Sequence, residues 1–275
     1  MKQKVSVAAV QDMKRRGQKI VAVVVYDYQM ARIVDRAGVE IVSVGDSVGV
    51  AMWGQQSELD VTLDEMLLAC KAVRRGVEQA IVSCDVPYGP LQEGAAAAVQ
   101  AARRLVTEGG ADMLKLDAAA DHPAAVRAIV AAGIPVWAQF GITPHTAARF
   151  GGLSKAPSDM AAGLTAEFVA EARLLEQTGA ALLDFTNSGP VAGPAVTQAV
   201  SIPVLGGLGG GPWLDGRVRA VANAIGSMAA ALDDSIDRYA NVARITFDAI
   251  QAYAGDVRAG RQVRGGPAGS PTPKA

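Results

Sequence analysis

The sequence is poor in residues that build several common kinds of site. Its 275 residues include only two histidines and two cysteines, which argues against a histidine-rich metal site and a disulfide scaffold. Lys and Arg number 26 and Asp and Glu 27, so the positive surplus of a nucleic-acid-binding protein is missing. The apolar runs are far shorter than the roughly 20 residues that cross a membrane, and the polar start does not resemble a targeting signal. We therefore expect a cytoplasmic protein whose partners include neither nucleic acid nor membrane.

What the sequence does contain is a regular alternation of apolar, β-branched runs with Ala-rich helical patterns. Half of the residues are hydrophobic, enough for a large core. The runs are apolar on both faces, which is typical of parallel strands covered by helices. The predicted strands are Lys19–Val25, Glu40–Val44, Gln79–Cys84, Ala111–Leu116, Pro135–Phe140, Ala181–Phe185, Ile202–Leu205 and Ala222–Ile225. The predicted helices between them are Tyr28–Ala37, Thr62–Arg75, Glu93–Glu108, Pro123–Ala132, Thr165–Thr178 and Pro190–Ala199.

Eight successive strand–helix units predict an α/β fold, a single-domain (β/α)8 TIM barrel. We expect the barrel to occupy residues 1–259 and to end in a long helix, Asp234–Val257. The Gly- and Pro-rich stretch 260–275 is predicted to be a disordered tail. The alternative is an open, doubly wound sheet, but no G-x-G-x-x-G follows the first predicted strand.

Acidic side chains follow three successive predicted strands. Asp46, Asp85 and Asp117 come at or just after the strand ends, and Lys115 shares the face of Asp117 because strand side chains repeat every second residue. In a TIM barrel the catalytic groups lie at the rim that the carboxyl ends of the strands form. Carboxylates without histidine suit Mg²⁺, which could chelate a small 2-keto acid and stabilise its enolate. The alternative is that each Asp only caps the helix that follows.

Motifs spread through most of the chain give it a family resemblance. The sequence resembles the ketopantoate hydroxymethyltransferase family, also called 3-methyl-2-oxobutanoate hydroxymethyltransferase, of the phosphoenolpyruvate mutase/isocitrate lyase superfamily. The matching segments, in order, are 26–28, 44–49, 61–62, 72–76, 85–87, 113–116, 141–144, 150–152, 202–204 and 255–260.

The resemblance implies an enzyme of pantothenate biosynthesis. Such a Mg²⁺-dependent barrel, usually a homodecamer, transfers a one-carbon unit from 5,10-methylenetetrahydrofolate to the enolate of 2-oxoisovalerate. Carried over by position, Asp46 and Asp85 would bind the metal and Asp117 would stand close to it. Ser47 and Lys115 would hold the carboxylate of the substrate.

Two positions depart from the family pattern in a way that bears on the reaction. Thr186 stands where the family has a glutamate base, and a hydroxyl cannot act as a base near neutral pH without an activating partner. Gln139 replaces a histidine and can hydrogen-bond but cannot shuttle protons. Three explanations remain open. The base has moved to Asp184, two residues earlier on the same face, or the reaction has become an aldolase or C–C lyase reaction, or the barrel binds a keto acid without catalysis.

The late histidine is expected to have a minor role. His145 follows Thr143-Pro144 and has no partner that the sequence reveals. We expect it to lie at the surface near a helix end.

Overall fold

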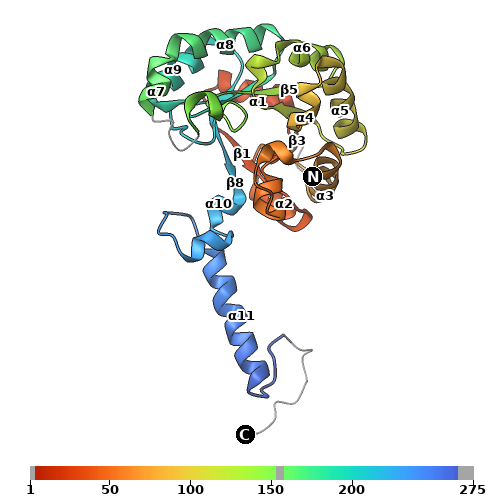
Figure 1. Cartoon of the computed structure of the whole chain (residues 1–275), viewed down its shortest axis with the longest axis vertical. Coiled ribbons are helices and arrows are strands. Elements are labelled where there is room, and N and C mark those ends of the chain that lie inside the picture. Colours follow the sequence, from red (N-terminus) through yellow and green to blue (C-terminus); the bar gives the residue numbers. More distant parts are fainter. Residues whose placement is uncertain (1–3, 153–157, 266–275) are drawn as a thin grey trace. The chain divides into compact units, whose positions relative to one another are not determined.

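The computed structural model describes residues 4–152 and 158–265 of the chain (Figure 1). It divides into two compact units, Met1–Ala220 and Val221–Ala275. The first unit holds all the strands of the described residues: β1 Ile20–Val24, β2 Ile41–Val44, β3 Ile81–Asp85, β4 Met113–Leu116, β5 Val136–Gly141, β6 Leu182–Thr186, β7 Val204–Leu205 and β8 Gly216–Ala220.

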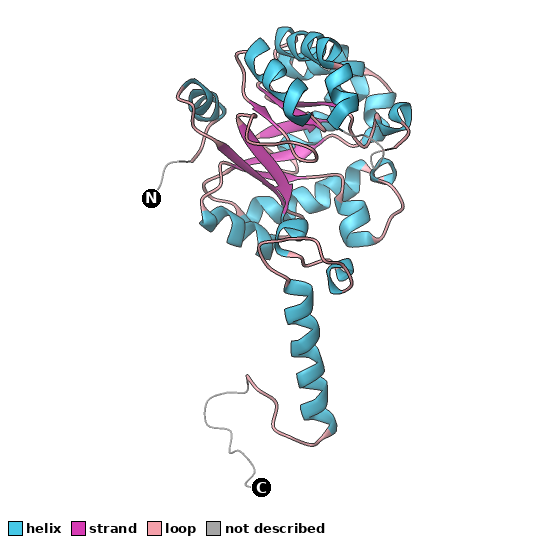
Figure 2. Cartoon of the chain, turned by 90° about the vertical axis from the view of Figure 1, so that its left-hand side faces the viewer, coloured by secondary structure: helices cyan, strands magenta, loops and turns pink. Residues whose placement is uncertain are grey.

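The eight strands form a nearly closed barrel. Every hydrogen-bonded pair is parallel, in the order β7-β6-β5-β4-β3-β2-β1-β8. The two ends of this order approach each other, since the Asp215 N–H donates to the Val204 carbonyl over 2.9 Å. The strands lie inside a layer of helices (Figure 2). The predicted (β/α)8 TIM barrel is confirmed, with all its strands in the first unit, and the open sheet is excluded.

Helices follow the strands as the alternation predicts. Those of the first unit are α1 Val7–Arg15, α2 Tyr28–Ala37, α3 Leu63–Gly76, α4 Tyr88–Gln92, α5 Ala95–Thr107, α6 Pro123–Ala131, α7 Ser158–Gly163, α8 Thr165–Gln177 and α9 Gly189–Ala199. Local capping explains several starts: the Asp27 carboxylate accepts from Met30 N–H, and Thr62 and Glu65 form a reciprocal capping box. Helix α1, with Ser6 as its cap, was not among the predicted helices.

Apolar packing between strands and helices fixes the half of the barrel that carries β5 and β6. The rings of Phe140 and Phe185 stack at 4.7 Å, and Phe168 of α8 meets Phe185 edge-on at 5.1 Å. All three side chains are buried. Burying large rings is the main favourable term in such a core, so this cluster holds the two strands in a fixed position under the rim.

The eighth predicted strand, Ala222–Ile225, is wrong. The strand is Gly216–Ala220, and Val221–Ile225 forms the short helix α10. Buried and exposed residues alternate along the observed strand: Gly216 and Val218 are buried, and Arg217 and Arg219 are exposed. The strand therefore does not form a continuous apolar run. A Cβ at Gly216 would lie 2.2 Å from the Ile20 carbonyl oxygen, which explains why glycine stands where β8 meets β1.

The second unit contains α10, a 3-10 turn at Ala229–Leu232 and the helix α11, Val242–Arg258. The predicted helix Asp234–Val257 therefore begins eight residues too early. Asn241 caps the observed start by accepting from Arg244 N–H, while Asp234 forms an ion pair with Arg238 in the non-helical segment before it. Of the predicted disordered tail, residues 266–275 lie outside the described residues, and 260–265 form neither helix nor strand.

In the part of the chain that the structure describes, no helix combines the length and the apolar character that a membrane span requires.

Candidate active site

The predicted site residues gather at the carboxyl ends of neighbouring strands, where a parallel barrel has its catalytic rim. Lys115, Gln139, Asp184 and Thr186 belong to the strands β4, β5 and β6 themselves. The side chains that were predicted to form the site are buried except for the half-buried Ser47: Asp46, Ser47, Asp85, Lys115, Asp117, Gln139, Asp184 and Thr186.

Asp46 and Asp85 form an adjacent pair of carboxylates. The backbone N–H of Asp46 donates to Asp85 Oδ2 over 3.3 Å, which holds the two residues side by side. Asp85 Oδ1 is buried and has no hydrogen-bond partner among the described residues. Burial raises the pKa of Asp85 to about 7; Lys115 opposes this shift and the negative charge of Asp46 adds to it. A buried oxygen without a donor is a costly arrangement that a cation would relieve.

Lys115, on β4, links the carboxylate pair to residues of β5 and β6. Its Nζ lies 3.1 Å from Asp85 Oδ2 and 3.9 Å from Asp184 Oδ2, and donates to Gln139 Oε1 over 2.7 Å. Burial alone would lower the pKa of Lys115, but the surrounding carboxylates, Asp85 first, raise it above its usual value. The side chain is therefore a fixed positive charge at the centre of the rim, suited to an anionic group of a ligand.

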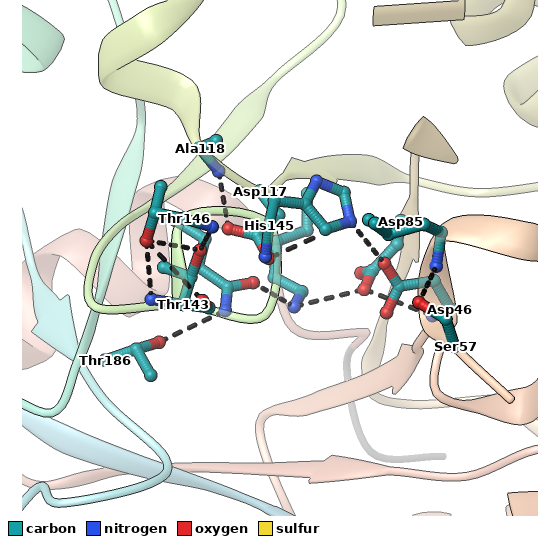
Figure 3. Close-up of polar contacts among 12 residues, drawn as sticks. Asp46, Ser57, Asp85, Asp117, Ala118, Thr143, His145, Thr146 and Thr186 are labelled. Carbon is teal, nitrogen blue, oxygen red and sulfur yellow. Dashed lines mark hydrogen bonds and ion pairs between the residues drawn. The ribbon is translucent and has the colours of Figure 1, made fainter. Parts of the chain in front are cut away.

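Gln139 continues this chain of hydrogen bonds to Thr186. Its Nε2 donates to Thr186 Oγ1 over 3.1 Å (Figure 3). Gly141, at the end of β5, has φ +93°, and a Cβ there would lie 2.6 Å from the Thr186 carbonyl oxygen. Only glycine permits this turn beside Thr186, so the backbone itself fixes the position of the threonine.

Asp184 lies beside Lys115 as a second buried carboxylate. Its Oδ1 has no hydrogen-bond partner among the described residues, while the backbone of Gly207 hydrogen-bonds to the carboxylate. Burial raises the pKa of Asp184 to about 6, against the pull of Lys115. A carboxylate with such a pKa can accept a proton near neutral pH.

The expectation for His145 is wrong. Its side chain is only 1 % exposed, and its Nε2 lies 3.2 Å from Asp46 Oδ2 and 3.9 Å from Asp117 Oδ2 (Figure 3). The ring also packs edge-on against Tyr88, with ring centres 5.1 Å apart. Burial lowers the pKa of His145, but its hydrogen bond to Asp46 and the charge of Asp117 raise it above the usual value overall.

A tight turn brings His145 into the site. Thr146 Oγ1 donates to the Gly141 carbonyl over 2.8 Å, and the Thr143 N–H donates to Thr146 Oγ1 over 2.9 Å. The chain after β5 thereby folds back over the rim, and the His145 N–H reaches Asp117 Oδ2 at 3.3 Å. The pair of threonines around Pro144 is the one local signal that could have indicated this turn.

Tyr26 is a second residue that the sequence reasoning missed. Its hydroxyl lies 3.0 Å from Ser47 Oγ, and the ring is buried at the end of β1. Burial raises the pKa of Tyr26, so the phenol stays protonated and can donate a hydrogen bond. It orients the serine that was predicted to hold a substrate carboxylate.

The donor set fits a magnesium ion held by two carboxylates. Asp46 and Asp85 supply hard oxygen ligands, and the unpartnered Asp85 Oδ1 is free to coordinate. Within residues 4–152 and 158–265, no group of three or more His, Cys, Asp or Glu side chains is arranged to hold a metal by itself. Mg²⁺ commonly uses one or two carboxylates, with water and substrate oxygens completing its shell. The role predicted for Asp117 at the metal stays a prediction.

Comparison with known proteins gives the same family along almost the whole chain. The family model described as ketopantoate hydroxymethyltransferase matches residues 4–262. A 3-methyl-2-oxobutanoate hydroxymethyltransferase of Desulfotalea psychrophila is 37% identical over 248 residues, which cover 90% of this chain and 88% of the relative. The enzyme of that name from Moorella thermoacetica is 36% identical over 258 residues, covering 94% of this chain and 95% of the relative.

Solved structures with low identity share the fold. A 2,3-dimethylmalate lyase of the PEP mutase/isocitrate lyase superfamily matches with a TM-score of 0.60 at 16% identity, covering 93% of this chain and 89% of that chain. A phosphonopyruvate hydrolase in complex with oxalate and Mg²⁺ matches with a TM-score of 0.59 at 13% identity, covering 98% and 92%. At these identities the likeness shows a common barrel.

Proposed function

Since the chain belongs to the ketopantoate hydroxymethyltransferase family, we propose that it is a Mg²⁺-dependent hydroxymethyltransferase-like enzyme acting on a small 2-keto acid of the 2-oxoisovalerate type. The observation that carries this proposal is the adjacent pair Asp46 and Asp85, with a buried unpartnered oxygen, beside the ammonium group of Lys115. Metal ligands and a fixed cation next to each other suit a molecule with a keto oxygen and a carboxylate on adjacent carbons.

Each residue has a role that follows from its chemistry. Asp46 and Asp85 would hold Mg²⁺, which when bound supplies a Lewis acid that polarises the keto group of the substrate. Lys115 neutralises the substrate carboxylate, and Ser47, oriented by Tyr26, donates to it. Asp117 accepts from the His145 N–H and would support water at the metal.

Formation of the enolate requires removal of a proton from C3 of the keto acid. Asp184 is the candidate base, since its raised pKa and its unpartnered Oδ1 suit proton transfer near pH 7. The C3 electron pair would then form the bond to the one-carbon unit of 5,10-methylenetetrahydrofolate, the proposed donor. The bonds from that carbon to the folate nitrogens break, water supplies the hydroxyl group, and tetrahydrofolate leaves.

A C–C lyase or aldolase is the second candidate. The observation that favours it is that Thr186 Oγ1 already accepts a hydrogen bond from Gln139, so the hydroxyl has no activating base at the rim position of β6. An enolate released by cleavage of a C–C bond needs no base that removes a C3 proton. A binding protein without catalysis would share the geometry and show neither reaction.

Deuterium exchange separates these candidates. The protein is incubated with 2-oxoisovalerate and Mg²⁺ in D2O, and deuterium at C3 is followed by NMR. Mg²⁺-dependent exchange supports the transferase with Asp184 as the base. Absence of exchange, together with cleavage of a hydroxylated 2-keto acid, supports the lyase. Absence of both reactions contradicts an enzymatic function.

Three further properties belong to the proposal. A place in pantothenate biosynthesis follows from the substrate type. A homo-oligomer, a decamer by family resemblance, is expected and can be measured by light scattering. A cytoplasmic location can be tested by fractionating the source cells.

A further inference from the structure

The hydrogen-bond chain from Lys115 to Thr186 allows only one arrangement of protons. The ammonium group of Lys115 has donors and no acceptor, so the atom of Gln139 that faces it at 2.7 Å must be the amide oxygen. The other end of the amide is then the NH2 group, and it must donate to Thr186 Oγ1 at 3.1 Å. A flipped amide would set two donors against each other. The charge of Lys115 therefore fixes the direction of both hydrogen bonds.

The direction of these bonds leaves the hydroxyl proton of Thr186 without a partner. The oxygen accepts from Gln139, and the O–H donates no hydrogen bond to any of the described residues. The residue is only 3% exposed, so water has little access to it. A buried donor of this kind is costly unless an acceptor meets it. A bound molecule is the acceptor that the arrangement lacks.

The position of Thr186 shows which part of a ligand it would meet. In the barrel order, β6 stands four strands away from β2, halfway around the ring of eight. Asp46 follows β2 and Asp85 ends β3, so the metal-binding carboxylates and Thr186 lie on different sides of the rim. A keto acid whose keto oxygen and carboxylate face Asp46, Asp85 and Lys115 extends its remaining carbon chain towards β6.

We infer that Thr186 is a specificity-determining hydrogen-bond donor that selects 2-keto acids carrying an oxygen atom on C3 or C4. This inference rests on the proposed function, because it assumes that a keto acid binds with its keto end at Asp46 and Asp85. In hydroxymethyl transfer the selected oxygen is the hydroxyl that the one-carbon unit brings to C4. In the lyase reaction it is the hydroxyl of the molecule to be cleaved. The inference therefore holds for either direction of C–C chemistry.

The expected discrimination is moderate. A hydrogen bond between neutral groups contributes little by itself, but a methylene group in place of the oxygen leaves the Thr186 donor buried and unpaired. We expect an oxygen-bearing keto acid to bind about tenfold more tightly than the keto acid with CH2 or CH3 at that place.

Matched pairs of keto acids test the inference. Binding to the full chain is measured calorimetrically with Mg²⁺ present. Hydroxypyruvate is compared with 2-oxobutanoate for an oxygen on C3, and 4-hydroxy-2-oxobutanoate with 2-oxopentanoate for an oxygen on C4. Tighter binding of the hydroxy acid in one pair supports the inference. Equal binding within both pairs overturns it and leaves the proposed function intact. If none of the four acids binds while 2-oxoisovalerate does, the inference is overturned and the proposed function stands; if 2-oxoisovalerate also fails to bind, the proposed function fails with it.

Variants at Thr186 attribute the preference to its hydroxyl. Thr186→Val replaces the hydroxyl by a methyl group of similar size, and we expect the affinity ratio within the discriminating pair to fall to about one. Thr186→Ser retains the hydroxyl and should keep most of the preference. A ratio that stays unchanged in Thr186→Val overturns the inference, because another group must then recognise the oxygen. Thermal unfolding of both variants confirms that they are folded.

The direction of the hydrogen bond has its own test, which also serves if Thr186→Val does not fold. Gln139→Glu supplies two acceptor oxygens, one for Lys115 and one for the Thr186 O–H, so the threonine then offers only an acceptor to the ligand. A methyl ether can accept but not donate. We expect the wild type to bind 3-methoxypyruvate or 4-methoxy-2-oxobutanoate more tightly than 2-oxopentanoate or 2-oxohexanoate, respectively. The Gln139→Glu variant should lose this preference, and a preference that survives overturns the inference.

Discussion

The two sides of the barrel rim differ in what they offer to a ligand. On the side of β2 and β3, Asp46 and Asp85 bring negative charge and an unpartnered carboxylate oxygen. On the side of β5 and β6, Gln139 and Thr186 form a neutral chain whose rim end is a hydroxyl. Lys115 touches both sides, since it binds Asp85 and Gln139.

The difference between the two sides suggests a different task for each of them in the proposed reaction. The charged side has the two carboxylates and the ammonium group that we propose to hold a metal ion and a keto acid. The neutral side has a hydrogen-bond donor at the rim, and its nearest carboxylate, Asp184, lies deeper on β6 beside Lys115. We thus propose that different strands bind the reacting end of the substrate and recognise the rest of it.

The largest expected effect comes from removing charge on the β2–β3 side. Asp85→Asn and Asp46→Ala each remove an expected metal ligand, and we expect Mg²⁺ affinity to fall by more than about 100-fold, since even outer partners of a metal site contribute 10–100-fold. Turnover that depends on Mg²⁺ should be lost with it. Mn²⁺ binding by electron paramagnetic resonance, with competition by Mg²⁺, measures the change. Asp12→Asn, at an exposed ion pair with Arg15, is the matched control. An unaltered metal requirement would refute the assignment.

The second prediction concerns the proposed base, Asp184, on the β6 side of the rim. Asp184→Asn keeps the shape of the side chain and removes its basicity, so we expect deuterium exchange at C3 to slow by about 10²–10⁴-fold. In the wild type the exchange rate should rise with pH up to about 6, because the base must be deprotonated, and level off above it. The measurement is the initial exchange rate between pH 5 and 8. Exchange that persists undiminished in the variant would show that Asp184 is not the base.

A smaller effect is expected where the loop after β5 meets the charged side. His145→Gln removes the ring that contacts Asp46 and Asp117, and we expect about tenfold weaker metal binding because the two carboxylates lose a positioning partner. Tyr88→Phe preserves the edge-on ring contact and serves as the control. Both are compared through the dissociation constant of Mn²⁺. Equal affinities in wild type and His145→Gln would confine His145 to a structural role.

The sequence predicts well whatever depends on local pattern. Apolar runs predicted seven of the eight strands to within two residues at each end, since strands buried on both faces must be continuously apolar. The strand-end rule then placed Asp46, Asp85 and Asp117, together with Lys115, at one rim without any knowledge of their contacts. The eighth strand was not predicted because its exposed arginines interrupt the apolar pattern.

What the sequence could not predict depends on contacts between distant residues. His145 reaches Asp46 across 99 positions, through a turn closed by Thr143 and Thr146. The direction of the hydrogen bond from Gln139 to Thr186 is likewise set by Lys115 on another strand. Neither follows from spacing along one element, so both required the three-dimensional structure.

The smallest effect tests whether burial raises a carboxylate pKa away from the rim as well. Glu171 of α8 has its pKa raised from 4.5 to about 7, first by burial and then by the charges of Glu167 and Asp121, while Arg149 opposes the shift. Because the folded state keeps this proton up to about pH 7 and the unfolded chain releases it near 4.5, the group makes the protein less stable as pH rises between these values.

Glu171→Gln removes this titration, so the Tm of the variant relative to wild type should be higher at pH 8 than at pH 5. The exposed Glu93→Gln is the control, and its Tm difference should be the same at both values of pH. A pH-independent difference for Glu171→Gln would mean that burial does not destabilise the charged carboxylate there. The raised pKa of Asp184 would then need a cause particular to the rim, and the contrast between the two sides of the barrel would have to be explained by more than desolvation.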